Sequence, residues 1–154
     1  MNLNFFDGLF LFIAILMNFL VIAIFIVRKE GFEQLEHKIG YIVISCAIPL
    51  FIIILNYILI GKELWIIIYI IIMISFLMIE MVLDYILKID FRTNLKIVVP
   101  YVIIYYIAFW GLLAISFVIN LIAGFIVFGV FILNLISTIY AHKSDKEDQV
   151  KSSN

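Results

Sequence analysis

Charged residues are scarce in this chain of 154 residues. Lys, Arg, Asp and Glu make up 14% of the sequence, whereas soluble domains contain about 25%. Apolar residues make up 67%, against roughly half in a soluble domain. The chain therefore has no extended basic surface for nucleic acid, and its length leaves no room for a separate soluble domain beside one small bundle. This composition predicts an integral membrane protein.

Residues that carry chemistry are equally rare. The one cysteine, Cys46, excludes an intramolecular disulfide and is expected to act as a small apolar filler. His37 has no nearby Cys or second His with which to hold a metal. No catalytic, nucleotide-binding or metal-binding motif occurs, and we identify no internal repeat. The sequence thus predicts no catalytic residue, no cofactor and no metal site, and an enzyme is not the expected function.

Long apolar segments are what the chain has in abundance. A helix needs about 20 predominantly apolar residues to cross a hydrocarbon core of about 30 Å. Barrel strands would alternate apolar and polar residues, and these segments do not. The predicted fold is therefore all-α, a polytopic bundle of five transmembrane helices. The expected spans are 6–27, 39–60, 64–87, 97–119 and 121–140.

The boundary between the last two spans is the least defined. Residues 97–140 contain no charge, and these 44 residues are too many for one helix. Asn120 or the nearby Ala123–Gly124 is the expected turn, with Trp110–Gly111 as an earlier alternative. At the start of the fourth span, Thr93 or Asn94 is expected to cap the helix.

The basic residues indicate how the chain crosses the membrane. Nine of the ten Lys and Arg residues fall at the ends and gaps that five spans place on one side, and Lys62 alone falls on the other. Basic residues near span ends are retained in the cytoplasm. We therefore expect the N-terminus outside and the C-terminus inside. A four-span chain would put the C-terminal basic cluster outside and break this pattern.

The two ends of the chain carry further expectations. The first segment lacks the basic region and small-residue cleavage site of a signal peptide, so it is expected to remain as the first helix. Residues 141–154 are polar and mixed in charge, which predicts a poorly ordered cytoplasmic tail after the transmembrane domain 1–140. The abundance of isoleucine suggests a prokaryotic source, and hence the plasma membrane as the location.

Two acidic residues lie well inside an apolar segment. Glu80 and Asp84 are spaced i, i+4, which places both on one face of an α-helix. Ionisable groups inside a membrane are costly and by default indicate a functional site. Tyr105 and Asn134 are expected at the same depth on the fourth and fifth helices. These four residues are the candidate site for an ion, a substrate or a partner helix, in a polar pocket open to the cytoplasm.

A purely structural role stays open for the same residues. Asp84 can pair with Lys88 at the interface, while Glu80 is hydrogen-bonded to a neighbouring helix or protonated. Polar residues also serve as contacts between helices in membranes. Because Asn18 and Asn134 would be costly against lipid, both are expected to point into the bundle.

Two classes of function fit these features. One is an oligomeric transporter or channel-like module, in which Glu80 responds to protons or cations. The other is a non-enzymatic accessory subunit, in which Glu80 and Asp84 bind a helix of another membrane protein. A third and weaker hypothesis is a lipid-modifying enzyme with Glu80, Asp84 and Asp90 as metal ligands. The expected partners are the lipid bilayer and either further copies of the chain or another membrane subunit.

Overall fold

The computed structural model of the chain describes residues 4–87 and 94–152, the stretch 142–152 by its backbone alone. Its elements are α1 (Phe5–Lys29), α2 (Glu33–Ser45), α3 (Ala47–Leu59), α4 (Leu64–Glu80), the π-helical segment η1 (Met81–Ile86), α5 (Leu95–Ile119) and α6 (Leu121–Ser152). Within the described residues, five segments are long and apolar enough to cross a membrane. The predicted all-α bundle of five membrane-spanning helices is confirmed.

Two of the five segments contain a local irregularity. Helices α2 and α3 form one span that is interrupted at Cys46, one turn before Pro49. Proline has no N–H to donate to the carbonyl four residues earlier, here that of Ser45, so the hydrogen-bond ladder is broken at this level. Helix α4 continues into η1 as the third span, where Leu87 N donates to Val82 O across five residues at 2.8 Å.

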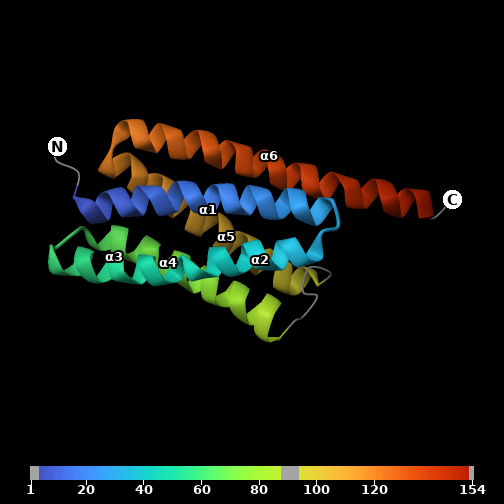
Figure 1. Cartoon of the computed structure of the whole chain (residues 1–154), viewed down its shortest axis with the longest axis horizontal. Helices are drawn as coiled ribbons and strands as arrows, with labels where there is room; N and C mark the ends of the chain where they lie inside the picture. The colour runs from blue at the N-terminus through green and yellow to red at the C-terminus, as the bar shows by residue number, and fades with distance from the viewer. Residues whose placement is uncertain (1–3, 88–93, 153–154) are drawn as a thin grey trace.

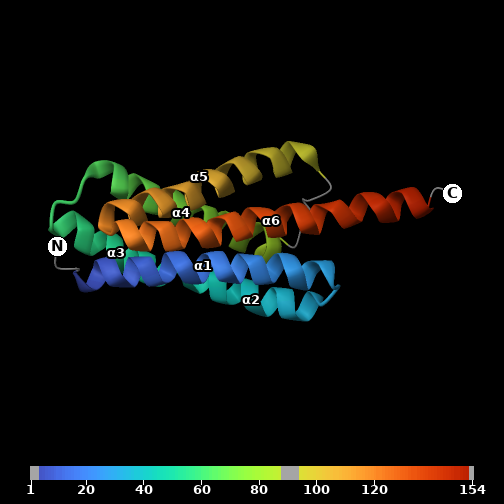
Figure 2. The same cartoon turned by 90° about the horizontal axis from the view of Figure 1, so that it is seen from above.

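Helix α1 lies between α6 and the α2–α3 span (Figures 1 and 2). Helix α1 also contacts α5, and α4 packs along α5. Many large apolar side chains face outward, among them Phe12, Ile122 and Phe125. Such a surface is suited to lipid, because lipid tails are as apolar as the side chains themselves.

Glycine ends two of the helices in the same way. Gly31 after α1 has φ +75°, and Gly61 after α3 has φ +68°. Phe32 N then donates to Val27 O at 3.1 Å, and Lys62 N donates to Tyr57 O at 2.9 Å. These are the six-to-one bonds of a Schellman motif, which satisfies carbonyl groups left over at a helix end.

The turn between α5 and α6 is a single residue, Asn120. Its backbone is extended, and its Oδ1 atom accepts a hydrogen bond from Ala123 N at 3.0 Å, as an N-cap residue does. Gly124 then lets α6 pass close to α5, because a Cβ atom there would lie 2.8 Å from the Cα atom of Phe117. The expected turn at Asn120 is confirmed, and the alternative at Trp110–Gly111 is wrong because α5 runs through it.

The helix ends differ from expectation in two places. The second span begins at Glu33, six residues before the expected start at position 39, because its polar first turns remain helical. Acidic residues such as Glu33 and Glu36 favour a helix N-terminus. Helix α6 continues to Ser152, through the segment whose composition suggests poor order.

The two ends of the bundle differ in charge. We call the end that carries Arg28, Lys29, Lys38 and Lys96 the basic end; α1 ends there, α2 and α5 begin there, and α6 leaves the bundle there (Figure 1). The opposite end carries Asp7, Lys62 and Glu63. Which end faces the cytoplasm stays a prediction from the positive-inside rule.

Close packing of α4 on α5 depends on Gly111. A Cβ atom at this position would lie 2.5 Å from Tyr69 Cδ1 and 2.9 Å from Tyr69 Cβ, so the ring cannot simply turn away. We expect Gly111→Ala to lower the free energy of unfolding by about 1–3 kcal/mol, as overpacking does in a well-packed core. The measurement is a denaturant titration of the purified protein in detergent micelles.

Gly129→Ala on α6 is the matched control. No atom lies within 4 Å of the added Cβ. The free energy of unfolding of this variant should therefore be unchanged, or rise by up to about 1 kcal/mol because alanine has the higher helix propensity. Equal destabilisation of the two variants would contradict the close approach of α4 and α5.

Candidate functional site

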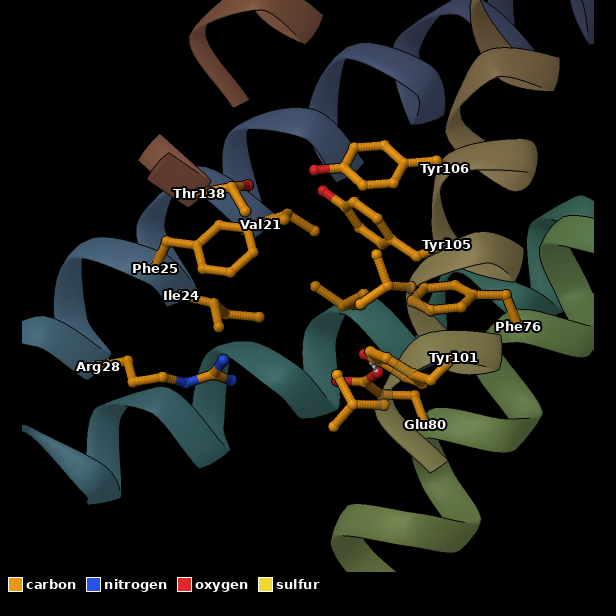
Figure 3. Close-up of a pocket in the computed structure, with 13 residues that line it drawn as sticks. Val21, Ile24, Phe25, Arg28, Phe76, Glu80, Tyr101, Tyr105, Tyr106 and Thr138 are labelled. Atoms are coloured by element: carbon orange, nitrogen blue, oxygen red, sulfur yellow. Dashed lines mark hydrogen bonds between the residues drawn. The ribbon is translucent and has the colours of Figure 1, made fainter. Parts of the chain in front are cut away.

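A cavity of about 140 Å³ lies toward the basic end of the bundle. Five helices contribute to its wall, and most of the lining is aromatic or aliphatic (Figure 3). The lining residues are Val21, Ile24, Phe25 and Arg28 of α1, Val43 of α2, Phe76 and Glu80 of α4, Val98, Tyr101, Val102, Tyr105 and Tyr106 of α5, and Thr138 of α6. The polar pocket open to the cytoplasm stays a prediction, because the lining of this cavity is mostly apolar.

Glu80 is the acidic residue in the cavity wall. It is half-buried at the end of α4, and the hydroxyl of Tyr101 on α5 donates a hydrogen bond to its Oε2 atom (Figure 3). The Tyr101 ring packs beside Phe76, with ring centroids 5.6 Å apart. The carboxylate is thus held against an aromatic surface by a neighbouring helix, as one of the two structural alternatives for Glu80 anticipates.

The π-helical segment η1 separates Asp84 from this wall. The i, i+4 prediction assumes α-helical geometry, but hydrogen bonds in η1 span five residues, so the chain after Glu80 is rotated relative to an α-helix. Asp84 is half-buried and does not line the cavity. Lys88, the predicted partner of Asp84, lies outside the described residues.

Tyr85 fixes the position of η1 against α2. Its hydroxyl donates to the backbone carbonyl of His37 at 3.1 Å, and its ring lies 4.5 Å from the ring of Tyr41. Gly40 makes this contact possible, because a Cβ atom there would lie 1.9 Å from the Tyr85 hydroxyl. Isolated π-helical turns occur frequently at functional sites, and this one directly follows the carboxylate in the cavity.

Tyr105 connects the cavity to a buried chain of hydrogen bonds. Its hydroxyl donates to Asn134 Oδ1 at 2.9 Å, Asn134 Nδ2 donates to Asn18 Oδ1 at 3.3 Å, and Asn18 Nδ2 donates to the carbonyl of Ala14 at 2.8 Å. The chain links α5, α6 and α1. Asn18 and Asn134 are 0% and 1% exposed, so the prediction that both point into the bundle is confirmed.

The four candidate residues are thus divided among three places. Glu80 and Tyr105 line the cavity together, Asn134 lies directly behind Tyr105, and Asp84 is outside the wall. Sequence spacing placed Glu80 and Asp84 on one face of an α-helix, whereas the π-helical segment rotates Asp84 away from the cavity wall.

Arg28 at the edge of the cavity is paired with an acid. Its Nε and Nη2 atoms lie 2.8 Å and 2.6 Å from Glu36 Oε1, so the pair ties the end of α1 to the first turns of α2. Beside it, the Lys29 ammonium lies over the ring of Tyr140, 3.1 Å from its centroid. Both contacts join helices at the basic end, and the sequence analysis assigned no role to either.

The opposite end holds a second polar group that sequence analysis missed. Asp7 is buried, accepts a hydrogen bond from the Tyr57 hydroxyl at 2.8 Å and lies 3.2 Å from Lys62 Nζ. The Lys62 ammonium also lies 5.2 Å from the centre of the Tyr57 ring. We call these three residues the Asp7 clamp. The available signal was the presence of one acid and one base near the same end of two apolar segments.

Apolar side chains separate the cavity from the Asp7 clamp. Between Asn18 and Asp7, the buried residues of α1 are Met17, Ala14, Ile13, Leu11 and Phe10. Asn18 and Asp7 are eleven residues apart, which corresponds to about 16 Å along the helix axis. In the described structure, the polar groups that begin at the cavity therefore end at Asn18, near the middle of the bundle.

Metal chemistry has no support in the part of the chain that the structure describes. No group of three or more His, Cys, Asp or Glu residues there is close enough to hold a metal ion. Asp90, the third ligand in the enzyme hypothesis, is not among those residues.

Comparisons of the chain with protein-family models, curated proteins and solved structures gave no match. The function must therefore be inferred from the chain's own residues and their geometry.

We expect the hydrogen bond between Asn18 and Asn134 to stabilise the bundle. In a double-mutant cycle with Asn18→Leu and Asn134→Leu, the coupling free energy should be about 0.6 kcal/mol and at most about 1.7 kcal/mol, the range for side-chain hydrogen bonds in membranes. This coupling free energy is measured by denaturant unfolding of the wild type and the variants in detergent micelles.

The control cycle pairs Asn134→Leu with Ser116→Ala. Ser116 is also buried, but its hydroxyl donates to the backbone of its own helix at Leu112. Its coupling to Asn134 should lie within about 0.5 kcal/mol of zero. A coupling as large as that between the two asparagines would contradict a specific bond between them.

Proposed function

We propose that this protein is a small transporter or channel-like module of the plasma membrane that binds its ligand in the cavity at the basic end. The basic end faces the cytoplasm in this proposal, with the N-terminus outside. The observation that carries it is the cavity itself, whose wall includes the Glu80 carboxylate and lies on one side of the apolar buried stretch of α1. We propose that the cavity opens to one side of the membrane at a time, as alternating access requires.

The location of Glu80 supports this function over a purely structural one. Glu80 contacts a neighbouring helix through Tyr101, as a structural carboxylate would, but it also lines a cavity and is followed by the π-helical segment η1. Ionisable residues in membrane spans often face water-filled cavities and mark ion or substrate routes. The proposal includes a homo-oligomer, because five helices enclose little space for a pathway across the membrane.

An accessory role is the second candidate, and one observation favours it. The span formed by α4 and η1 has the smallest buried share of the five, and Ser75 in its middle is exposed. A polar hydroxyl on an outward face suits contact with a helix of another subunit. In that case the same span carries both Glu80 and the surface for the partner.

Orientation is tested with reporters that are active in only one compartment. We expect a reporter fused after Asn154 to report the cytoplasm, and one inserted at Lys62 to report the outside, because nine of ten basic residues lie on the side of the first reporter. Activity of both in the same compartment would contradict five spans, and exchanged locations would contradict the proposed orientation.

Transport is tested in vesicles with purified protein. We expect flux of at least one monovalent cation from a panel of inorganic and small organic ions. Glu80→Gln should reduce this flux at least tenfold, because it removes the charge but keeps an acceptor for the Tyr101 hydroxyl. Folded yield, measured by size-exclusion chromatography, should be unchanged.

The accessory role predicts a different pair of results. If Glu80 binds a partner helix through a hydrogen bond, Glu80→Gln would retain the partner and Glu80→Leu would release it. No flux in the wild type with any ion of the panel, or normal flux in Glu80→Gln, would contradict the transport proposal.

A further inference from the structure

Most hydroxyl groups in the cavity wall already donate a hydrogen bond to another group of the protein. The hydroxyl of Tyr101 donates to Glu80, that of Tyr105 donates to Asn134, and that of Thr138 donates to the backbone carbonyl of Asn134 at 2.9 Å. Each of these hydroxyl oxygens keeps lone pairs that can accept a bond. Tyr106 also lines the cavity, so the wall offers a ligand three hydroxyls that act as acceptors and one that can donate or accept.

Of the two charged groups of the wall, Arg28 is paired with an acid and Glu80 can accept further hydrogen bonds. Arg28 uses its Nε and Nη2 atoms on Glu36, which balances its charge. Glu80 contributes a carboxylate, whose two oxygens have about four acceptor sites in total. It can therefore serve a ligand in addition to the partners that it already has.

Aromatic rings from three helices complete the wall. Phe25 comes from α1, Phe76 from α4, and Tyr105 and Tyr106 from α5 (Figure 3). The faces of such rings carry partial negative charge and attract ammonium groups within about 6 Å. Ring faces, hydroxyl lone pairs and a carboxylate all favour the same kind of ligand.

We infer that the cavity binds a small monovalent organic ammonium ion, held by the Glu80 carboxylate and the rings of Phe76, Tyr105 and Tyr106. The volume of about 140 Å³ is close to the roughly 150 Å³ of an apolar protein cavity that accommodates benzene. An ammonium group with one ring or a short alkyl chain fits this space. The inference rests on the proposed function for the cavity's role and adds the chemical class of its ligand.

The experiment compares three probes of one shape and different charge: benzylammonium, benzyl alcohol and benzoate. Binding to the purified full-length protein in nanodiscs of neutral lipid is measured by isothermal titration calorimetry, with empty nanodiscs as the blank. We expect benzylammonium to bind at least tenfold more tightly than benzyl alcohol, and benzoate to bind most weakly. Binding of benzoate as tightly as benzylammonium would overturn the inference, because Arg28 would then determine the ligand.

Two pairs of variants identify the groups responsible. Glu80→Gln should weaken benzylammonium at least tenfold and leave benzyl alcohol unchanged, whereas Glu63→Gln, an exposed acid at the opposite end, should affect neither. Tyr106→Leu should weaken benzylammonium by roughly 2- to 30-fold, the range of a cation–π contact. Phe128→Leu, which removes a ring on the outer surface, should have no effect.

The remaining outcomes separate this inference from the proposed function. The ammonium site is overturned if benzylammonium does not bind to the folded wild-type protein, or if it binds to Glu80→Gln and Tyr106→Leu as tightly as to the wild type. This holds even where vesicles show flux of an inorganic ion. Binding with the expected dependence on Glu80 and Tyr106, but without flux of any ion, supports the site and contradicts transport.

Discussion

The bundle depends above all on the requirement that polar groups inside a membrane find partners within the protein. Asn134 meets this requirement for three helices at once, since its side chain contacts Tyr105 on α5 and Asn18 on α1. Its backbone carbonyl accepts the hydroxyls of Ser137 and Thr138. Moving α6 by one turn relative to α1 or α5 would leave several buried polar groups unpaired, at roughly 1–3 kcal/mol each. Asn134 therefore contributes to the register of these helices and to the shape of the cavity.

The sequence predicted well the features that depend on composition along the chain. Five spans follow from the length of the apolar segments, and the turn at Asn120 follows from an amide side chain that can cap a helix. Asn18 and Asn134 could be placed inside because lipid offers a side-chain amide no partner. In each case, the outcome depends on one segment and on the solvent around it, and neighbouring helices do not change it.

The features that sequence missed depend on contacts between segments. The π-helical segment η1 is fixed partly by Tyr85, which fits against α2 only because position 40 is a glycine. Asp7 lies at the edge of an apolar segment, where an acid could equally face water. It is buried because Tyr57 and Lys62, some fifty residues later in the chain, lie beside it. Neither contact leaves a pattern within its own segment.

For the proposed transport function, the two ends of the bundle together favour a moving transporter over an open pore. An ion leaving the cavity past Asn18 would meet about 16 Å of apolar side chains, and an unpaired charge in such surroundings is strongly disfavoured. Flux along α1 therefore requires this helix to separate from its neighbours near the opposite end. The Asp7 clamp holds that end closed, because it joins α1 to α3 and to the turn before α4. Opening the clamp would return Asp7 and Lys62 to water, and their hydration would offset part of the free energy lost with the ion pair. Asn134 would still join α1, α5 and α6. The hydrogen bonds that hold the cavity and the contacts that must break are thus separated along the same helix.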